Sequence, residues 1–263
     1  MRNLILMLIC LIALFISSCE WQVNGCVSGD GNEETRTIDL DREISKIVLQ
    51  IEAEVIISKG TSQEITIEGD GNLIDLIVND SDLSGDTWEV KIDGCSNTDG
   101  LKIFATLEDL EMLIIEGSGK FKTEGSIFEQ LEDLKLFIEG SGTMDIEIGT
   151  AGEVETKIEG SGNINIQLET TEKIKSSIQG SGKIESGGVT EELEQKIEGS
   201  GEMKFYDLIA QDAQITIEGS GDIEVFVEQS LNVTIDGSGK VCYKGNPTID
   251  TDISGNGNVK NCN

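Results

Sequence analysis

Apolar and polar residues alternate with a period of two along most of the chain beyond residue 110. From Leu134 to Ile148, every even position holds an apolar residue or glycine. The pattern returns from Val154 to Leu168, interrupted only by Thr156. Alternation of this kind is typical of β-strands with one buried face. The sequence therefore predicts long strands rather than helices here.

A tripeptide, Gly-Ser-Gly, recurs inside this alternation at nearly constant spacing. A repeat of roughly 20 residues predicts one structural unit that is stacked many times, so that neighbouring units bury a common core. Both glycines fall on the predicted buried face, which indicates a tight inward corner between two strands. The tripeptide begins at Gly117, Gly140, Gly160, Gly180, Gly199, Gly219 and Gly237, and Gly255-Asn256-Gly257 is a variant.

These features predict an all-β fold, a single-stranded parallel β-helix (solenoid) of about ten rungs, with the right-handed sense that parallel crossovers favour. We expect it to occupy residues 37–263. Residues 37–105 contain short β-branched runs without the full tripeptide, and we interpret Gly69-Asp70-Gly71 as a degenerate corner there. The longest spacing between tripeptides would be explained by one helical turn within Ile127–Leu134.

The N-terminus has the features of an export signal. Arg2 precedes an unbroken apolar run from Leu4 to Ile16, and Ser17-Ser18-Cys19 follows. This run is too short to span a bilayer, and its end resembles a bacterial lipobox, although Ile16 stands where leucine is usual. The resemblance implies a lipoprotein signal peptide over residues 1–18 and lipidation of Cys19. An ordinary signal peptide with an incidental cysteine is the alternative.

Residues 19–36 are polar and contain glycines, so we expect a tether between the lipid and the fold. Asp30-Gly31-Asn32 is reminiscent of a calcium loop, but the spaced oxygen ligands and the closing glutamate of an EF-hand are absent. A solvated linker is the preferred interpretation.

With Cys19 lipidated and Cys10 removed with the signal peptide, four cysteines remain, and an even number in an exported chain suggests disulfides. Cys242 and Cys262 are 20 residues apart, about one repeat. Adjacent rungs would place them within disulfide range. We expect a Cys242–Cys262 bridge and a Cys26–Cys95 bridge, while the other two pairings of four cysteines stay open.

The composition argues against several functions. The net charge of −31 would repel nucleic-acid phosphates, so we expect no nucleic-acid partner. The chain has no histidine, which excludes a Ser-His-Asp site. Its acidic residues are repeated copies of one another, whereas glycoside hydrolysis needs two distinct acids facing each other. We therefore predict no catalytic residues, no metal site and no cofactor.

Stacking would align equivalent side chains in columns on the outer surface. The residue before each tripeptide is usually acidic, so that a column of carboxylates would lie beside a column of serines. Such a column would either bind cations or carbohydrate, or form a solvated acidic face that keeps a repetitive β surface soluble. Its members are Glu116, Glu139, Glu159, Gln179, Glu198, Glu218 and Asp236.

The region from Ile44 to Val259 resembles a bacterial family described as putative autotransporter adhesin, head GIN domain (DUF2807). The resemblance rests on Ile44–Ile51, Ile65–Leu73, Leu110–Gly119 and the later tripeptides. It implies an exported, often lipidated β-helical protein and brings no catalytic residues. We therefore expect a non-catalytic lipoprotein of the cell envelope with an adhesive or scaffolding role and an unidentified glycan or protein ligand. We expect its lipid to anchor it in the outer membrane, on the periplasmic or the surface face. A glycan-binding or glycan-active β-helix and a cation-binding acidic surface protein are the alternatives.

Overall fold

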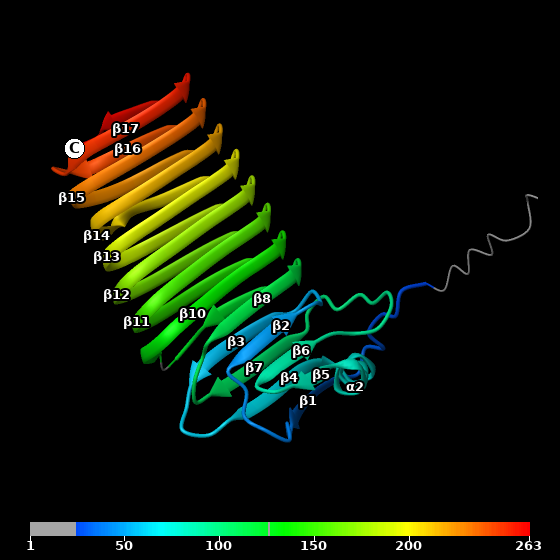
Figure 1. Cartoon of the computed structure of the whole chain (residues 1–263). Coiled ribbons are helices and arrows are strands. Elements are labelled where there is room, and N and C mark those ends of the chain that lie inside the picture. Colours follow the sequence, from blue (N-terminus) through cyan, green and yellow to red (C-terminus); the bar gives the residue numbers. More distant parts are fainter. Residues whose placement is uncertain (1–24, 126) are drawn as a thin grey trace, which may run out of the picture.

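The computed structural model describes residues 25–125 and 127–263, and it is a parallel β-solenoid of about seven turns (Figure 1). The proposed signal segment and Cys19 lie outside the described residues. Each typical turn contains one long, bent strand that begins and ends at a tripeptide. The strands of this repeating body are β8 (Met112–Gly117), β9 (Lys120–Thr123), β10 (Phe128–Gly140), β11 (Thr143–Gly160), β12 (Asn163–Gly180), β13 (Lys183–Gly199), β14 (Glu202–Gly219), β15 (Asp222–Gly237), β16 (Lys240–Gly245), β17 (Thr248–Gly255) and β18 (Asn258–Asn261).

Successive turns of the body lie over one another in register. Gly140 pairs with Gly160, and Gly160 pairs with Gly180, all in parallel strands. The same correspondence continues through Gly199 to Gly255. The predicted parallel β-solenoid is thus confirmed, with about seven turns where about ten were expected. The expected helical turn within Ile127–Leu134 is wrong, because β10 begins at Phe128 and extends the solenoid wall instead.

The two glycines of each corner are needed for different reasons. Gly160 has φ +128°, a backbone conformation that L side chains rarely adopt, and a Cβ there would lie 2.4 Å from the Gly140 carbonyl oxygen. Gly162 is buried, and its Cβ would lie 2.7 Å from Cγ2 of Ile138. Only the second glycine therefore faces the core, and the prediction that both glycines do is wrong. The first is half-buried and makes the bend.

A thin aliphatic core runs along the solenoid axis. Ile138, Ile158 and Ile178 form one of its columns, each at most 1% exposed. The middle turns interrupt this core with polar side chains. Thr156, Ser176 and Gln195 follow one another in register, and Thr156 Oγ1 donates a hydrogen bond of 2.8 Å to Ser176 Oγ. Gln195 is only 1% exposed, and its side-chain amide has no hydrogen-bond partner among the described residues.

The N-terminal end is a cap with a different topology. We call it the cap; its elements are β1 (Glu33–Ile38), β2 (Lys46–Leu49), β3 (Glu54–Lys59), β4 (Glu64–Asp70), α2 (Gly71–Asp80), β5 (Asp82–Ser84), β6 (Thr87–Val90) and β7 (Lys102–Leu107). β2 lies between β6 and β8, and β3 lies between β7 and β9, all in parallel. β4 then pairs antiparallel with both β7 and β1, which closes the stack.

The expected corner at Gly69-Asp70-Gly71 is wrong. Gly69 and Asp70 end β4, Asp70 is the N-cap residue of α2, and Gly71 begins the helix. Leu73, Ile74 and Ile77 lie on one side of α2 and are at most 1% exposed, so the helix covers the end of the core. The spacing of these three residues is helical, and it is the signal that the reading of a degenerate corner overlooked.

The described part of the segment expected to be a tether, residues 25–36, contributes to the cap. Its residues 33–36 belong to β1, where Arg36 forms ion pairs with Glu34 of the same strand and with Asp75 of α2. No helix in residues 25–125 and 127–263 is long and apolar enough to cross a membrane.

Candidate functional site

The outer columns predicted from the repeat are present. Glu116, Glu139 and Glu159 pair in register, and the column continues through Gln179, Glu198, Glu218 and Asp236. The neighbouring serines also form a column. From Ser141 to Ser238, each serine N–H donates to the carbonyl of the first glycine of the preceding turn, as Ser161 N does to Gly140 O at 2.9 Å. The tripeptides thus build both the bend and the rung-to-rung hydrogen bonds.

Lysines in the adjacent column offset the carboxylates. Lys157 Nζ lies 2.5 Å from Glu159, and Lys196 Nζ lies 2.5 Å from Glu198 and 3.3 Å from Glu218. These hydrogen bonds raise the pKa of Lys157 and of Lys196 above the usual value. Gln179 is the uncharged member of the column, and its side-chain amide donates a hydrogen bond to Glu198 at 3.4 Å. The column therefore contains ion pairs at Glu159, Glu198 and Glu218 within its row of acids.

No group of three or more His, Cys, Asp or Glu side chains in the described part of the chain is arranged to hold a metal ion. Asp30, in the segment weighed as a calcium loop, instead accepts hydrogen bonds from the backbone and side chain of Asn32. These two bonds lower the pKa of Asp30. They fix a turn against the start of α2, where Gly31 N–H donates to Asp70 at 2.6 Å.

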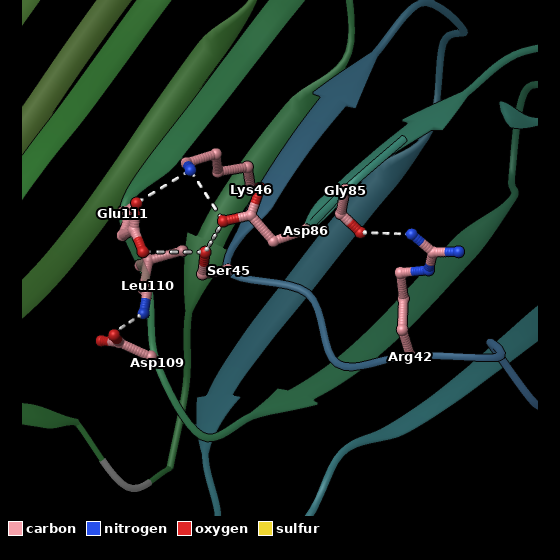
Figure 2. A network of polar contacts seen from close by, with 8 residues as sticks. All are labelled: Arg42, Ser45, Lys46, Gly85, Asp86, Asp109, Leu110 and Glu111. Atoms are coloured by element: carbon pink, nitrogen blue, oxygen red, sulfur yellow. Dashed lines mark hydrogen bonds and ion pairs between the residues drawn. The ribbon is translucent and has the colours of Figure 1, made fainter. Parts of the chain in front are cut away.

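A polar network joins the cap to the body, and we call it the joint (Ser45, Lys46, Asp86 and Glu111). Figure 2 shows its centre, where Lys46 reaches two carboxylates. Lys46 Nζ lies 2.7 Å from Asp86 and 2.9 Å from Glu111. Ser45 Oγ lies 3.1 Å from an oxygen of each of these carboxylates, and its single hydrogen can be donated to either. The network ties β2 to the segments before β6 and β8, which lie 40 or more residues away along the chain.

The joint holds a serine beside a lysine, a pair that can serve as nucleophile and base in other proteins. Here the charges have the opposite effect. The hydrogen bonds that Lys46 donates to Asp86, which has the larger effect, and to Glu111 raise the pKa of Lys46, so it stays protonated and cannot accept a proton from Ser45. The hydrogen bond that Lys46 donates in turn lowers the pKa of Asp86. The geometry is that of a structural clip, which spacing along the sequence did not reveal.

Two hollows on the described surface are open to solvent, and charged and apolar groups line them together. One of about 370 Å³ lies beside the joint and is lined by Lys46, Glu111, Glu132 and Lys135 among others. Another of about 260 Å³ lies on the face after the corner, between Asp145, Asn165 and Lys183. In that face Asn165 donates to Asp145 at 2.7 Å and Gln167 donates to Asn165 at 3.1 Å.

Exposed apolar side chains form a short ridge on the C-terminal half. Val189, Ile209 and Phe226 are in register on three successive turns, and Val189 and Ile209 are about 40% exposed. Lys244 follows in the next turn, with Nζ 4.0 Å from the ring centre of Tyr206. Partial burial, then the nearby charge of Glu224, raises the pKa of Tyr206. Sequence reasoning missed this ridge because a bulge in β14 shifts the register after Phe205.

Both expected disulfides are present. Cys26 and Cys95 have Cα atoms 4.6 Å apart, and Val27 N–H donates to Cys95 O beside them. Cys242 and Cys262 have Cα atoms 5.8 Å apart on the two last turns. The first bridge holds the start of the described chain to the cap, and the second holds the last turn to the body.

Comparison with known proteins agrees with this architecture. The model of a family described as "Putative auto-transporter adhesin, head GIN domain" matches residues 43–247. Among curated proteins, none matches the chain. Several solved structures match over 90% of this chain.

Three of these structures come from the genus Parabacteroides. A "putative lipid binding protein" from P. distasonis is 26% identical, is covered over 100% of its own length and has a TM-score of 0.81. A "putative adhesin" from P. merdae is 22% identical, is covered over 99% and has a TM-score of 0.80. A second "putative adhesin" from P. distasonis is 19% identical, is covered over 100% and has a TM-score of 0.77. With the family match over most of its length, the chain belongs to the DUF2807 family of auto-transporter adhesin-like head GIN domains.

Proposed function

We propose that this protein is an exported lipoprotein of the cell envelope whose solenoid is a rigid, non-catalytic display surface for adhesion or scaffolding. The observation that carries the proposal is the position of Cys26. It lies seven residues after Cys19 and is joined by a disulfide to Cys95 in the cap. Seven extended residues reach at most about 25 Å. A lipid on Cys19 would therefore hold the cap near the membrane.

The rest of the molecule fits display better than turnover. The outer faces are repeated, and acids such as Glu159 and Glu198 are paired with lysines of the same face. Family membership supports an adhesive role at the cell envelope. Two disulfides suit an exported protein, because thiols stay reduced in the cytosol.

A name given to one relative raises a second possibility, the binding of a lipid by the folded domain. A buried acyl chain would need an apolar cavity. The solenoid axis is instead filled by side chains such as Ile158 and Ile178, and the hollows described above are lined by charged groups. We favour lipid as the anchor, attached at Cys19, over lipid as a ligand of the fold.

Fractionation of cells tests the anchor. Cys19→Ala should move the protein from the membrane fraction to the soluble fraction, whereas Cys10→Ser, in the same segment, should leave it in the membrane. Labelling with a radioactive or tagged acyl chain should mark the Cys10→Ser protein and should not mark the Cys19→Ala protein. Retention of the Cys19→Ala protein in membranes with no change in labelling would contradict lipid anchoring.

Display and adhesion need separate measurements. Protease treatment of intact cells should release fragments of the solenoid if it faces outward. Cells producing the protein should then adhere to a glycan- or protein-coated surface more strongly than cells that lack it. The amide and carboxylate ladder at Asp145, Asn165 and Gln167 favours a glycan as the alternative ligand. Turnover of any polysaccharide on a glycan array would overturn the non-catalytic role.

A further inference from the structure

The two ends of the solenoid differ in how the core is covered. At the cap, Leu73, Ile74 and Ile77 of α2 are at most 1% exposed. At the other end, β17 and β18 pair only with β15 and β16, and no described strand lies on their far side. We call the β17–β18 turn the distal edge. It is visible in red in Figure 1.

The distal edge presents core-type residues to solvent. Ile249 and Ile253 are 38% and 40% exposed, although Leu231 and Ile235, their partners one turn earlier, are 0% exposed. One further layer of backbone over β17 would therefore bury both isoleucines. Unpaired N–H and C=O groups along the same strand favour a β-strand as that layer.

The distal edge is also firmly held in shape. The Cys242–Cys262 disulfide joins its last strand to the turn below. Asn263 exchanges two hydrogen bonds with the backbone of Gly245, at 2.8 and 2.9 Å, and Cys262 N–H donates to Tyr243 O at 2.8 Å. A partner would meet a pre-ordered surface, which lowers the entropy cost of binding.

Charge selects which partner can approach. Residues 210–236 contain six acidic residues and no lysine or arginine. Residues 237–263 contain only two acidic residues, Asp250 and Asp252, against Lys240, Lys244 and Lys260. Two copies of a chain with net charge −31 repel each other along their bodies, and the distal edge is where this repulsion is weakest.

We propose that the distal edge is a self-association surface, on which a second copy of this chain docks end to end. A two-fold axis would place β17 of one copy antiparallel to β17 of the other and bury Ile249 and Ile253 of both. The same register sets Asp250 opposite Asp252 of the second copy, a repulsion that salt should also screen. The apolar residues are spread over β17 and β18, since Val259 of β18 is also partly exposed. A second solenoid end covers this whole cross-section, whereas a single peptide strand covers one face.

Sedimentation of residues 25–263 tests the inference. These residues contain the cap, the core and both disulfides, so they can be studied without the first 24. We expect a reversible monomer–dimer equilibrium at micromolar to submillimolar concentration. Salt should strengthen it, because screening reduces repulsion between the acidic bodies.

Ile253→Asp should raise the dissociation constant at least about tenfold, because it places a charge in the centre of the contact. Val78→Asp is the matched control: Val78 is 49% exposed on α2, at the opposite end, and this variant should dimerise normally. Hydrogen exchange provides a second readout that needs no variant. Amides of β17 should gain protection as concentration rises, whereas amides of α2 should not.

A monomer at every concentration would overturn the proposal. So would a dimer that Ile253→Asp leaves intact, or open-ended filaments, which would indicate head-to-tail contacts. Association through the distal edge requires no anchor, so this result is independent of the fractionation of Cys19→Ala.

Discussion

The repeating body and the cap are both built mainly of parallel strands, but they are specified at different ranges along the chain. In the body, each residue pairs with one about 20 positions away, and each turn repeats the same contacts. In the cap, β2 is flanked by strands that begin about 40 and 66 residues later, and an antiparallel pair and a helix close the end. The body is thus a sum of near-identical neighbours, whereas the cap depends on a few unique contacts.

The largest effect is expected at a corner of the body. Gly180→Val should destabilise the fold by about 3–5 kcal/mol, because φ there is +125° and a Cβ would lie 2.4 Å from the Gly160 carbonyl oxygen. Guanidinium unfolding measures the loss, with Ser181→Ala in the same tripeptide as the control. Hydrogen exchange should show that the damage is greatest in the adjoining turns. Equal unfolding midpoints for the two variants would contradict the role of this glycine.

A truncation in the cap tests the other region. Ile74→Ala should lower the free energy of unfolding by about 2–4 kcal/mol, because the Ile74 side chain on the inner side of α2 is fully buried and its truncation leaves a cavity. Val78→Ala, on the exposed side of the same helix, should change stability little. Amides of β1, β4 and α2 should lose protection while those of β14 and β15 keep theirs. Uniform loss along the whole chain would show that cap and body unfold as one unit.

A substitution inside the body should increase stability. Gln195→Leu should raise the free energy of unfolding by about 1–2 kcal/mol, because the buried amide has no partner among the described residues and lies next to Ile215 in its column. Gln214→Leu, at an exposed position, is the control and should have almost no effect. Thermal unfolding compares the two, and a lower midpoint for Gln195→Leu would mean that the amide makes favourable contacts.

The smallest effect is expected at the joint, and it depends on pH. Because a hydrogen bond with Lys46 lowers the pKa of Asp86, the ionised carboxylate stabilises the fold above the unfolded pKa of about 3.9. This contribution is lost as pH falls through the lower, folded pKa. Asp86 is 45% exposed, so Asp86→Asn should cost no more than about 1 kcal/mol at neutral pH.

Urea unfolding at several pH values measures this difference, which should disappear in acid. Asp99→Asn, at an exposed position, should show no comparable pH dependence. A difference between wild type and Asp86→Asn that persists unchanged at low pH would mean that the carboxylate charge is not responsible.

The repeat allowed the body to be predicted in detail. Gly140, Gly160 and Gly180 mark the same bend in each turn, so their spacing fixes the register, the outer columns and the closeness of Cys242 to Cys262. The joint could not be predicted in the same way. Ser45, Asp86 and Glu111 belong to no repeat, and nothing in their spacing indicates that β2 lies between β6 and β8.

The sequence by itself therefore determined the solenoid, because a strand that alternates with period two and bends at regular glycines can bury its apolar face only against copies of itself. The tertiary structure decided how the core is covered at each end of the solenoid. The spacing of Leu73, Ile74 and Ile77 indicates a helix locally, but only the position of the open core end in space decides that this helix covers it. Likewise, the exposure of Ile249 and Ile253 follows from what lies beyond them in space, which no local pattern encodes.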